Sequence, residues 1–354
     1  MQMQNINITY SSLIRVIIVV LAVAFLYVIR DIVLVLFLSI ILSAALDPWV
    51  SWFERRHLPR SVGMLAIYIV LFAAISLVGV LIIPAVTTQA EVLGTNLPSY
   101  YERIVDTWSK HLPFIGDPAA RNVETVARTM GMWVGNVLPA IRGIFGGGFT
   151  FFLILVLTFY LSCQDRGLKR FFRSIMPVNY QPYFTRMTNR VQQKMGMWLR
   201  GQLLLSVVIF LVTAVSLFIF NSITHAAPYW LVLAFIAGIL EAVPFLGPFI
   251  AGTIAAVLTL ANSFWAAIAV VLIYIIIQQL ENNILVPRIM HRAVGLNPIV
   301  VILVVVIGGR LAGVLGSLIA IPVAAALQVF LKDVLVKEKE KEKELALPVP
   351  EAGA

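Results

Sequence analysis

Long apolar runs with very few charged residues follow one another along most of the chain. Two of them, separated only by Arg30-Asp31, fill residues 12–46, and further runs cover 62–86, 143–163, 200–220 and 264–280. About 20 consecutive apolar residues form a helix that crosses the roughly 30 Å hydrocarbon core of a bilayer. The pattern predicts transmembrane helices, and it predicts that the first two runs form a retained helical hairpin rather than a cleaved signal sequence.

Two further apolar runs, residues 229–262 and 298–331, are interrupted near their middle. The breaks contain Glu241, Pro244, Gly247 and Pro248 in the first run and Gly309, Arg310 and Gly313 in the second. Lipid cannot hydrogen-bond the backbone groups that such a break frees, so protein or a water-filled cavity must cover it. Each half spans only about 22 Å at 1.5 Å per residue. We predict two broken helical hairpins, which are either re-entrant from one side or cross the membrane twice.

The order span, hairpin, span, hairpin from residue 200 to 331 suits an inverted repeat, which is a feature of many secondary transporters. Sliding the sequence by 69 residues places Glu241 over Arg310 and aligns small and apolar neighbours. Apolar sequence produces such matches easily, so the alignment alone leaves the repeat open. If the repeat holds, the carboxylate and the guanidinium would either pair or both contact a substrate.

Glu241 and Glu281 are the only acids between residues 201 and 331. An ionisable residue at membrane depth is costly and is usually functional. A carboxyl group in a low-dielectric cavity can exchange protons near neutral pH, which makes Glu241 the candidate for proton or cation coupling. The alternative is that Glu241 only accepts hydrogen bonds from backbone groups freed at the kink. The predicted substrate or ion path comprises Glu241, Pro244, Gly247, Pro248, Gln278, Glu281, Asn282, Asn283, Arg288, Gly309, Arg310 and Gly313.

Parts of this predicted path also have a purely structural interpretation. The polar residues from Gln278 to Asn283 suit an interfacial helix end whose amides satisfy backbone carbonyls and which Pro287 terminates. Gly309 and Gly313 form a GxxxG pair, which also favours close packing of helices.

The segment 164–199 is strongly basic and has an amphipathic helical pattern. Its apolar stripe includes Met187, Met195 and Trp198, and Arg186, Arg190 and Lys194 line another face. This pattern predicts a helix on an anionic membrane surface, with the three basic residues in contact with lipid. A positively charged cytoplasmic loop that fixes orientation explains the charge equally well.

The remaining segments complete a prediction of topology. Residues 87–142 carry balanced charges and four prolines, which indicates a small helical cap outside the cytoplasm. Lys337 to Glu344 alternates Lys and Glu, and we predict a frayed helix followed by disorder in this charged tail. Cytoplasmic loops are rich in Lys and Arg, so both termini are predicted to be cytoplasmic. The predicted division is N-terminal transmembrane helices at 1–86, the cap at 87–142, a transmembrane helix at 143–163, the basic segment at 164–199, a transport core at 200–331 and the tail at 332–354.

Composition supports a membrane protein and excludes several other classes. The chain is 60% hydrophobic and only 12% charged, against roughly 25% charged residues in soluble domains. The net charge is +9, and most of the Lys and Arg residues lie between the apolar runs. The topology of a membrane protein therefore explains the charge better than nucleic-acid binding does. The single Cys163 excludes an internal disulfide, and the histidines show no metal-ligand spacing. We predict no metal and no cofactor. Neither a phosphate-binding loop nor a catalytic constellation is present, so the sequence does not predict an enzyme.

Four stretches together resemble the AI-2E family, a group of bacterial and archaeal multi-pass proteins that includes permeases of the PerM type. They are Glu241–Pro248, Gln278–Met290, Val294–Pro298 and Gly308–Gly313. The resemblance is specific over about 200–331 and rests on hydropathy elsewhere. It implies an all-α fold of about eight hydrophobic segments in the bacterial inner membrane. It also implies a homo-oligomer, with a pentamer as the candidate assembly.

The resemblance implies transport, since members are associated with export of the quorum-sensing signal autoinducer-2 and others with sodium/proton antiport. The first hypothesis is therefore a secondary transporter that moves a small hydrophilic solute, such as an autoinducer-2-like signal, or an ion, coupled to protons or sodium. The alternatives are a sodium/proton antiporter and a non-transporting scaffold that binds lipids or proteins.

Overall fold

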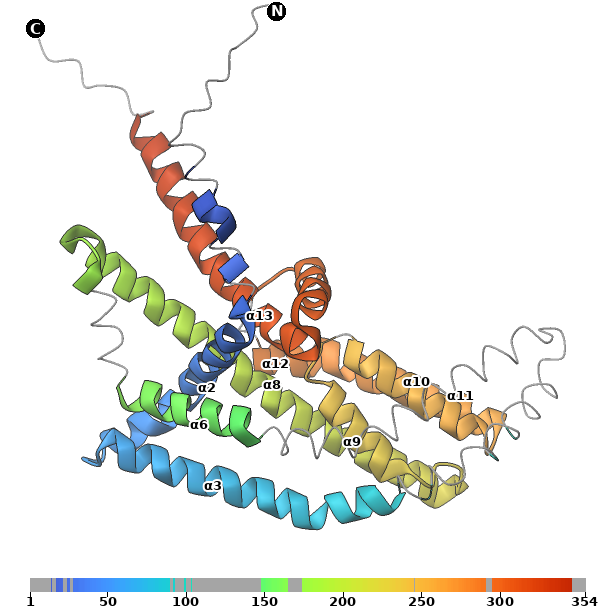
Figure 1. Ribbon diagram of the computed structural model, residues 1–354. Helices are drawn as coiled ribbons and strands as arrows, with labels where there is room; N and C mark the ends of the chain where they lie inside the picture. The colour runs from blue at the N-terminus through green and yellow to red at the C-terminus, as the bar shows by residue number, and fades with distance from the viewer. Residues whose placement is uncertain are drawn as a thin grey trace, which may run out of the picture.

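The chain is all-α in a computed structural model that describes residues 28–89, 148–164, 174–244, 246–290 and 295–345, with residues 14, 17–21, 24, 25, 92, 99 and 103 (Figure 1). The predicted cap lies almost wholly outside these residues. The helices are α2 (Arg30–Glu54), α3 (Arg60–Leu81), α6 (Gly148–Cys163), α8 (Gln181–Thr224), α9 (Trp230–Leu240), α10 (Leu246–Leu260), α11 (Phe264–Leu280), α12 (Val286–Met290) and α13 (Pro298–Leu345). A 3-10 turn, η2 (Val178–Tyr180), precedes α8, and a π turn, η3 (Glu281–Leu285), joins α11 to α12. This confirms the predicted fold class.

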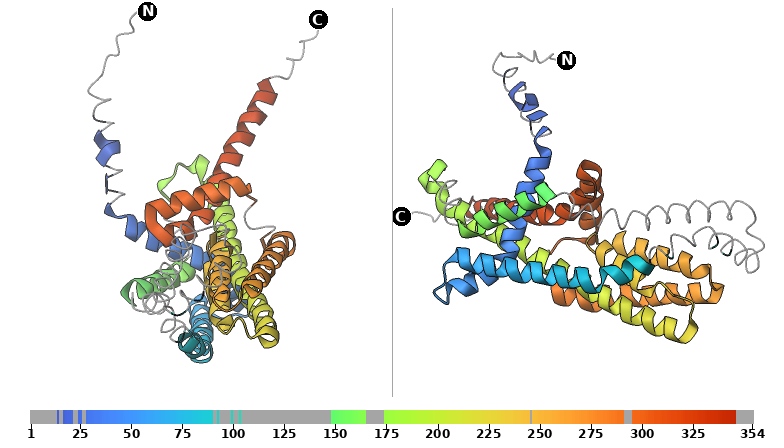
Figure 2. Two further views of the ribbon diagram at one scale, coloured as in Figure 1. Left: turned by 90° about the vertical axis from the view of Figure 1, so that its right-hand side faces the viewer. Right: turned by 60° about the horizontal axis from the view of Figure 1, so that its bottom comes forward.

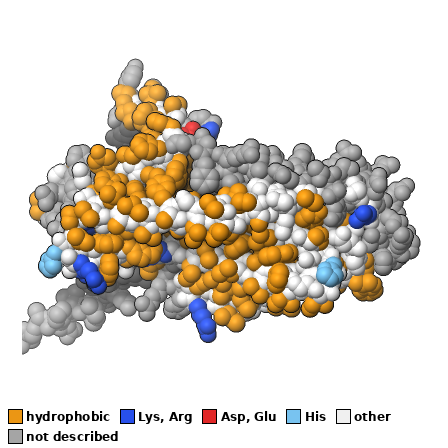
Figure 3. All heavy atoms as spheres, turned by 90° about the horizontal axis from the view of Figure 1, so that it is seen from below, with side chains coloured by type: hydrophobic (Ala, Val, Ile, Leu, Met, Phe, Trp, Pro, Cys, Tyr) orange, Lys and Arg blue, Asp and Glu red, His pale blue; other side chains and the backbone are white. Residues whose placement is uncertain are grey.

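Four of the described helices are long and apolar enough to cross a membrane: Arg30–Glu54, Arg60–Gln89, Val178–Thr224 and Phe264–Met290. Outward side chains are also apolar: Ile69 and Val80 on α3 are 62% and 72% exposed, and Phe249 on the shorter helix α10 is 75% exposed. Hydrophobic side chains dominate the described part of the face in Figure 3, and Lys, Arg and His are few there. Continuous apolar surface on this scale needs a lipid environment. The molecule is therefore a polytopic membrane protein.

Helix α8 is the element against which most of the others pack. It contacts α2, α9, α11, α12 and α13, while α10 packs on α9 and α11 (Figures 1 and 2). At 44 residues it is about 66 Å long. The sequence predicted a surface helix followed by a separate span, but the two are one uninterrupted helix. The stripe of Met187, Met195 and Trp198 is buried in the protein, with Met195 packed on α2 and both Met195 and Trp198 on α13, rather than on lipid.

The predicted hairpin turn at Arg30-Asp31 is absent. The amide of Ile29 donates to the carbonyl of Phe25, and the amide of Val33 donates to the carbonyl of Ile29, each at 3.0 Å. These i to i−4 bonds run through Ile29, the N-cap of α2, so the chain does not reverse direction at the charged pair, whose side chains are exposed. The helix also continues through Pro48 to Glu54, beyond the predicted end of this run at Asp47-Pro48.

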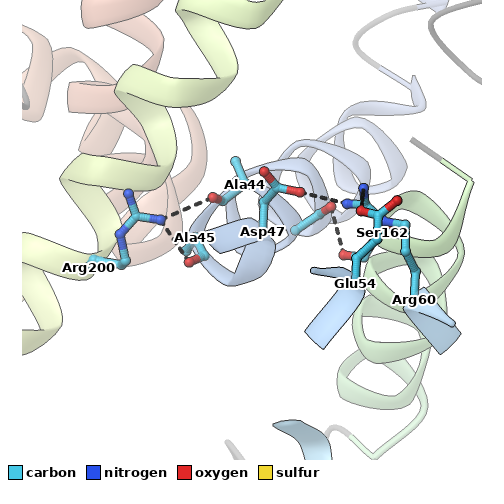
Figure 4. Close-up of polar contacts among 8 residues, drawn as sticks. Ala44, Ala45, Asp47, Glu54, Arg60, Ser162 and Arg200 are labelled. Atoms are coloured by element: carbon cyan, nitrogen blue, oxygen red, sulfur yellow. Dashed lines mark hydrogen bonds and ion pairs between the residues drawn. The ribbon is translucent and has the colours of Figure 1, made fainter. Parts of the chain in front are cut away.

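Arg200 on α8 caps the backbone of α2 where a proline interrupts it (Figure 4). Pro48 has no N–H, so the carbonyl of Ala44 loses its ordinary helical partner. The Arg200 guanidinium donates to the carbonyl oxygens of Ala44 at 3.3 Å and Ala45 at 2.9 Å. Gly196, one turn earlier on α8, lies so close to Ala44 that a Cβ there would overlap the same carbonyl. The two helices therefore cross at a backbone contact that a cation stabilises.

Arg60 ties the ends of α2, α3 and α6 together (Figure 4). Its guanidinium donates to Asp47 Oδ1 at 2.6 Å, to Glu54 Oε2 at 3.1 Å and to the carbonyl oxygen of Ser162 at 3.0 Å. The Arg60 side chain is only 18% exposed. A mostly enclosed guanidinium with three acceptors fixes the relative position of these three helix ends.

We expect Arg60→Gln to destabilise the protein, because glutamine cannot reach all three acceptors and leaves two carboxylates without their cation. The expected loss is about 1–2 kcal/mol, since the acidic partners are partly solvated. The measurement is the midpoint of thermal unfolding in detergent. Arg30→Gln is the matched control, because the Arg30 side chain is 50% exposed and lies 3.8 Å from the neighbouring Asp31. Equal midpoints for the two variants would contradict this assignment.

Both predicted hairpins are present. The first consists of α9 and α10, and the second lies inside α13, whose helical geometry breaks at Ala312 and Gly313 (φ 61°). Its two arms fold back on each other, since the Ser317 hydroxyl donates to the Val305 carbonyl at 3.1 Å. Beyond residue 331 the second arm continues as helix to Leu345, into the region predicted to fray.

The two hairpins share a similar close contact, in which the glycines are equivalent at a shift of 69 residues and the carbonyl partners are one residue out of that register. A Cβ on Gly247 would overlap the carbonyl of Leu240, and a Cβ on Gly316 would overlap the carbonyl of Gly308. Gly247 and Gly316 stand 69 residues apart, which is the shift at which the sequence aligned the two hairpins. This correspondence of backbone contacts supports the internal repeat.

Candidate functional site

The break between α9 and α10 is a compact turn that satisfies its own backbone. The amide of Glu241 donates to the carbonyl of Ala237, and the amide of Gly247 donates to the carbonyl of Val243, both at 2.9 Å. Gly247 allows this turn because its missing side chain leaves room for the Leu240 carbonyl. The Glu241 side chain is therefore not needed to accept freed backbone amides, which was the structural alternative for this residue.

The Glu241 carboxylate is enclosed and has no hydrogen-bond partner among the described residues. Its side chain is 0% exposed, and both oxygens are buried without a donor. Gln202 on α8 approaches the same residue, but its amide nitrogen donates to the backbone carbonyl of Glu241, at 2.6 Å. The amide oxygen of Gln202 is also buried without a partner. The acceptor groups of both residues are thus buried without a hydrogen-bond donor from the described residues.

These groups line a cavity of about 330 Å³. Its walls come from α8, the first break, the segment from η3 to α12, and residues before and within α13. Trp198, Leu205, Met290 and Ile321 supply much of its apolar surface. Its polar side chains come from Gln202, Glu241, Glu281 and Asn282. A mostly apolar cavity with a few convergent polar groups is the usual form of a small-molecule site.

Glu281 brings a second carboxyl group to the cavity. It opens the π turn η3, is 5% exposed, and its Oε2 is buried without a donor. A π turn inserts one extra residue into a helix and occurs frequently at functional sites. Two buried carboxylates that line one cavity repel each other and lose their hydration, so the cavity favours a bound proton or another cation.

The structure brings together only part of the predicted path. Glu241, Pro244, Glu281 and Asn282 line the cavity, and Gly247 is buried beside it. The other members do not line it. Pro248 lies in the first turn of α10, and Gln278 and Asn283 form hydrogen bonds between α11 and η3. Arg288 is exposed, and Gly309, Arg310 and Gly313 lie in the second hairpin.

The expected approach of Arg310 to Glu241 does not occur. Arg310 is exposed, and no ion pair joins it to Glu241 in the described part of the chain. The second hairpin meets the cavity through Val301 and Ile321, which lie away from its tip. The charged group that shares the cavity with Glu241 is therefore Glu281, which has the same sign.

Gln202 and Trp198 are among the cavity residues that the sequence analysis missed. Gln202 was treated as part of a span, although it is an isolated amide that opens an otherwise apolar run. That isolation was the available signal, because a buried amide requires partners. Trp198 was assigned to a stripe facing lipid. The basic residues proposed to touch lipid are placed differently from one another, since Arg186 is exposed and Arg190 lies 3.8 Å from Asp333 on α13. Their contact with lipid stays a prediction.

Comparison with known proteins agrees with this architecture. The profile of the AI-2E family transporter group matches residues 16–335. The chain belongs to the AI-2E transporter family. Among its relatives, "Putative transport protein YrrI" of Bacillus subtilis is 29% identical over 312 residues, covering 86% of this chain and 87% of the relative. "Putative permease PerM" of Escherichia coli K12 is 26% identical over 260 residues, covering 69% and 67%. The AI-2E protein described here is thus a multi-pass membrane transporter, embedded in lipid and acting on a small solute.

Proposed function

We propose that this AI-2E protein is a secondary transporter whose solute or ion passes through the cavity between α8, the first hairpin and the π turn. The observation that carries this proposal is Glu241, a fully buried carboxyl group whose two oxygens accept no hydrogen bond from the described residues. Such a group is stable when it holds a proton or a cation, and it becomes charged and costly when it releases one. A site that gains or loses charge in this way can couple solute movement to an ion gradient.

The two hairpins supply the remaining parts of the proposal. Each brings a backbone break to membrane depth, and broken helices related by an internal repeat are typical of sites that alternate between the two sides of a membrane. The breaks would act as hinges, because few residues there make regular helical bonds. Residues 200–331 form the transport core in this proposal, both termini are cytoplasmic, and the chain works as a homo-oligomer.

The solute and the coupling ion are part of the proposal. Coupling to protons or sodium follows from Glu241 and Glu281, because oxygen ligands suit both ions. An autoinducer-2-like signal is the solute that the family resemblance suggests, and a pure sodium/proton antiporter is the second candidate. The two carboxyl groups favour this second candidate specifically, since protons and sodium would compete for the same oxygens.

The test is gradient-driven flux into liposomes that contain the purified protein. An imposed proton or sodium gradient should drive uptake of an autoinducer-2 preparation or of the counter-ion. Glu241→Gln should abolish gradient-driven flux, because an amide can neither release a proton nor neutralise a cation. Asp31→Asn is the control, since Asp31 is an acid whose side chain is 86% exposed. Absence of flux in the wild-type protein for every gradient and solute would favour the scaffold alternative, and flux that survives Glu241→Gln would remove Glu241 from the mechanism.

A further inference from the structure

No Lys, Arg or His side chain from the described part of the chain lines the cavity. Its polar side chains are two carboxyl groups and two amides. Of the nearby bases, Arg288 and Arg310 are exposed and do not line it, Lys194 does not line it although its ammonium lies close to the lining residue Gly295, and Arg292 lies outside the described residues. An anionic solute would therefore meet two carboxylates and would lose its hydration without compensation.

The orientation of Gln202 adds an acceptor to this set. The backbone carbonyl of Glu241 can only accept a hydrogen bond, so the atom of Gln202 that lies 2.6 Å from it must be the amide nitrogen. The amide oxygen is then directed elsewhere, and it is buried without a partner while Gln202 lines the cavity. A buried acceptor calls for a donor. A ligand that carries N–H groups would satisfy both Gln202 and the carboxylates.

The size and walls of the cavity argue for a ligand larger than a bare metal ion. Hard cations such as Ca²⁺ bind roughly six to eight oxygen ligands at 2.3–2.6 Å, whereas this cavity of about 330 Å³ has walls that are largely apolar. That volume lies in the range of small-molecule sites. Trp198 is among the wall residues, and an indole ring attracts cations that lie over its face.

We infer that the cavity binds a small organic monocation of the alkylammonium class. Its positively charged N–H head would lie among Glu241, Glu281 and the amide oxygen of Gln202, and its apolar body would lie against Trp198 and the aliphatic walls. This inference rests on the proposed function, because it names the class of solute that the same cavity carries. A proton and an organic cation would compete for one pair of carboxyl groups, which would exchange one for the other.

The test compares three ligands that share the same apolar body and differ in their head group. Purified full-length protein in detergent is titrated calorimetrically with hexylammonium, hexanol and hexanoate, and each titration is repeated into protein-free micelles to remove partitioning. We expect saturable binding of hexylammonium at least tenfold tighter than that of hexanol, and no binding of hexanoate. Equal affinity for hexylammonium and hexanol, or binding of hexanoate, would overturn the inference.

Variants then place the ligand in the cavity. Glu241→Gln and Glu281→Gln should each weaken hexylammonium binding at least tenfold, whereas Asp31→Asn removes an equal charge from an exposed position and should leave it unchanged. Unaltered binding in both cavity variants would refute the site. The head-group comparison uses only the wild-type protein, so it tests selective binding of an alkylammonium cation even if a variant fails to fold.

Two further outcomes separate this inference from the transport proposal. Saturable sodium binding without hexylammonium binding would overturn the alkylammonium inference and leave ion transport standing. Hexylammonium binding without gradient-driven flux of any solute would keep the site and refute the transporter mechanism.

Discussion

Gly247→Ala is expected to destabilise the protein by about 1–3 kcal/mol or more, although it adds only one methyl group. The new Cβ would overlap the carbonyl oxygen of Leu240 and lie 2.9 Å from the amide nitrogen of Glu241. Both atoms belong to the backbone of the break, so no flexible side chain can move aside. The turn that holds Glu241 must open to accept the methyl group. The measurement is thermal unfolding in detergent, followed by size-exclusion chromatography to detect misassembly.

Gly79→Ala is the matched control for this prediction. Gly79 lies inside α3, and a Cβ there meets nothing within 4 Å. Alanine has a higher helix propensity than glycine, so the control should be neutral or slightly stabilising. Similar unfolding midpoints for the two variants would show that the close approach at Gly247 does not restrict the turn. Gly316→Ala extends the comparison to the second hairpin, where the Gly308 carbonyl takes the place of the Leu240 carbonyl.

The hairpins were predictable because glycine, proline and charge interrupt an apolar run only where something other than lipid covers the break. The sequence placed both breaks within a few residues of where they occur, around Glu241 to Pro244 and at Ala312 and Gly313. The shift of 69 residues also matched similar backbone contacts at Gly247 and Gly316. Hydrophobic periodicity, helix breaks and repeats can all be recognised from the order of residues along the chain.

The partner of Glu241 could not be predicted because a linear alignment gives no rotation of a helix about its axis. Arg310 is equivalent to Glu241 by position, yet it lies on an exposed face while Val301 and Ile321 face the cavity. The same limit applied to α8. Its apolar stripe was visible, but whether lipid or protein covers such a stripe depends on α2 and α13, which are far away in the sequence. The sequence alone does not show which helices are in contact.

The bend of the chain at Arg30-Asp31 was wrongly predicted for a different reason. A charged pair between two apolar runs resembles a loop, yet both residues are compatible with a helix and can lie at its surface. An exposed charged pair at the helix surface lowers the stability of the protein little. It also leaves the backbone hydrogen bonds of Ile29 and Val33 intact. A turn needs residues that break helical bonding, and none is present at this point.

Gln202→Leu is expected to lower both stability and transport, which links the fold to the site. The substitution keeps the volume of the side chain but removes the donor that reaches the Glu241 carbonyl at 2.6 Å. Leaving a buried acceptor without its partner costs about 1–3 kcal/mol. Gln328→Leu is the control, because Gln328 donates to the Gly295 carbonyl at 3.0 Å in an exposed setting. Its loss should cost much less, since water can replace the amide.

The role of Gln202 is decided by comparing the unfolding midpoint of Gln202→Leu with its transport flux. If Gln202 only fastens α8 to the break, Gln202→Leu should lower the unfolding midpoint, and flux per folded molecule should survive. If its amide oxygen also contacts the solute, flux should fall at least tenfold at temperatures where the variant is fully folded. We expect the second result, because that oxygen is buried without a partner in a cavity whose other polar groups are the carboxyl groups of Glu241 and Glu281 and the amide of Asn282. Burying the Gln202 amide oxygen without a hydrogen bond destabilises the protein, and a solute that donates a hydrogen bond to this oxygen explains best why it is there.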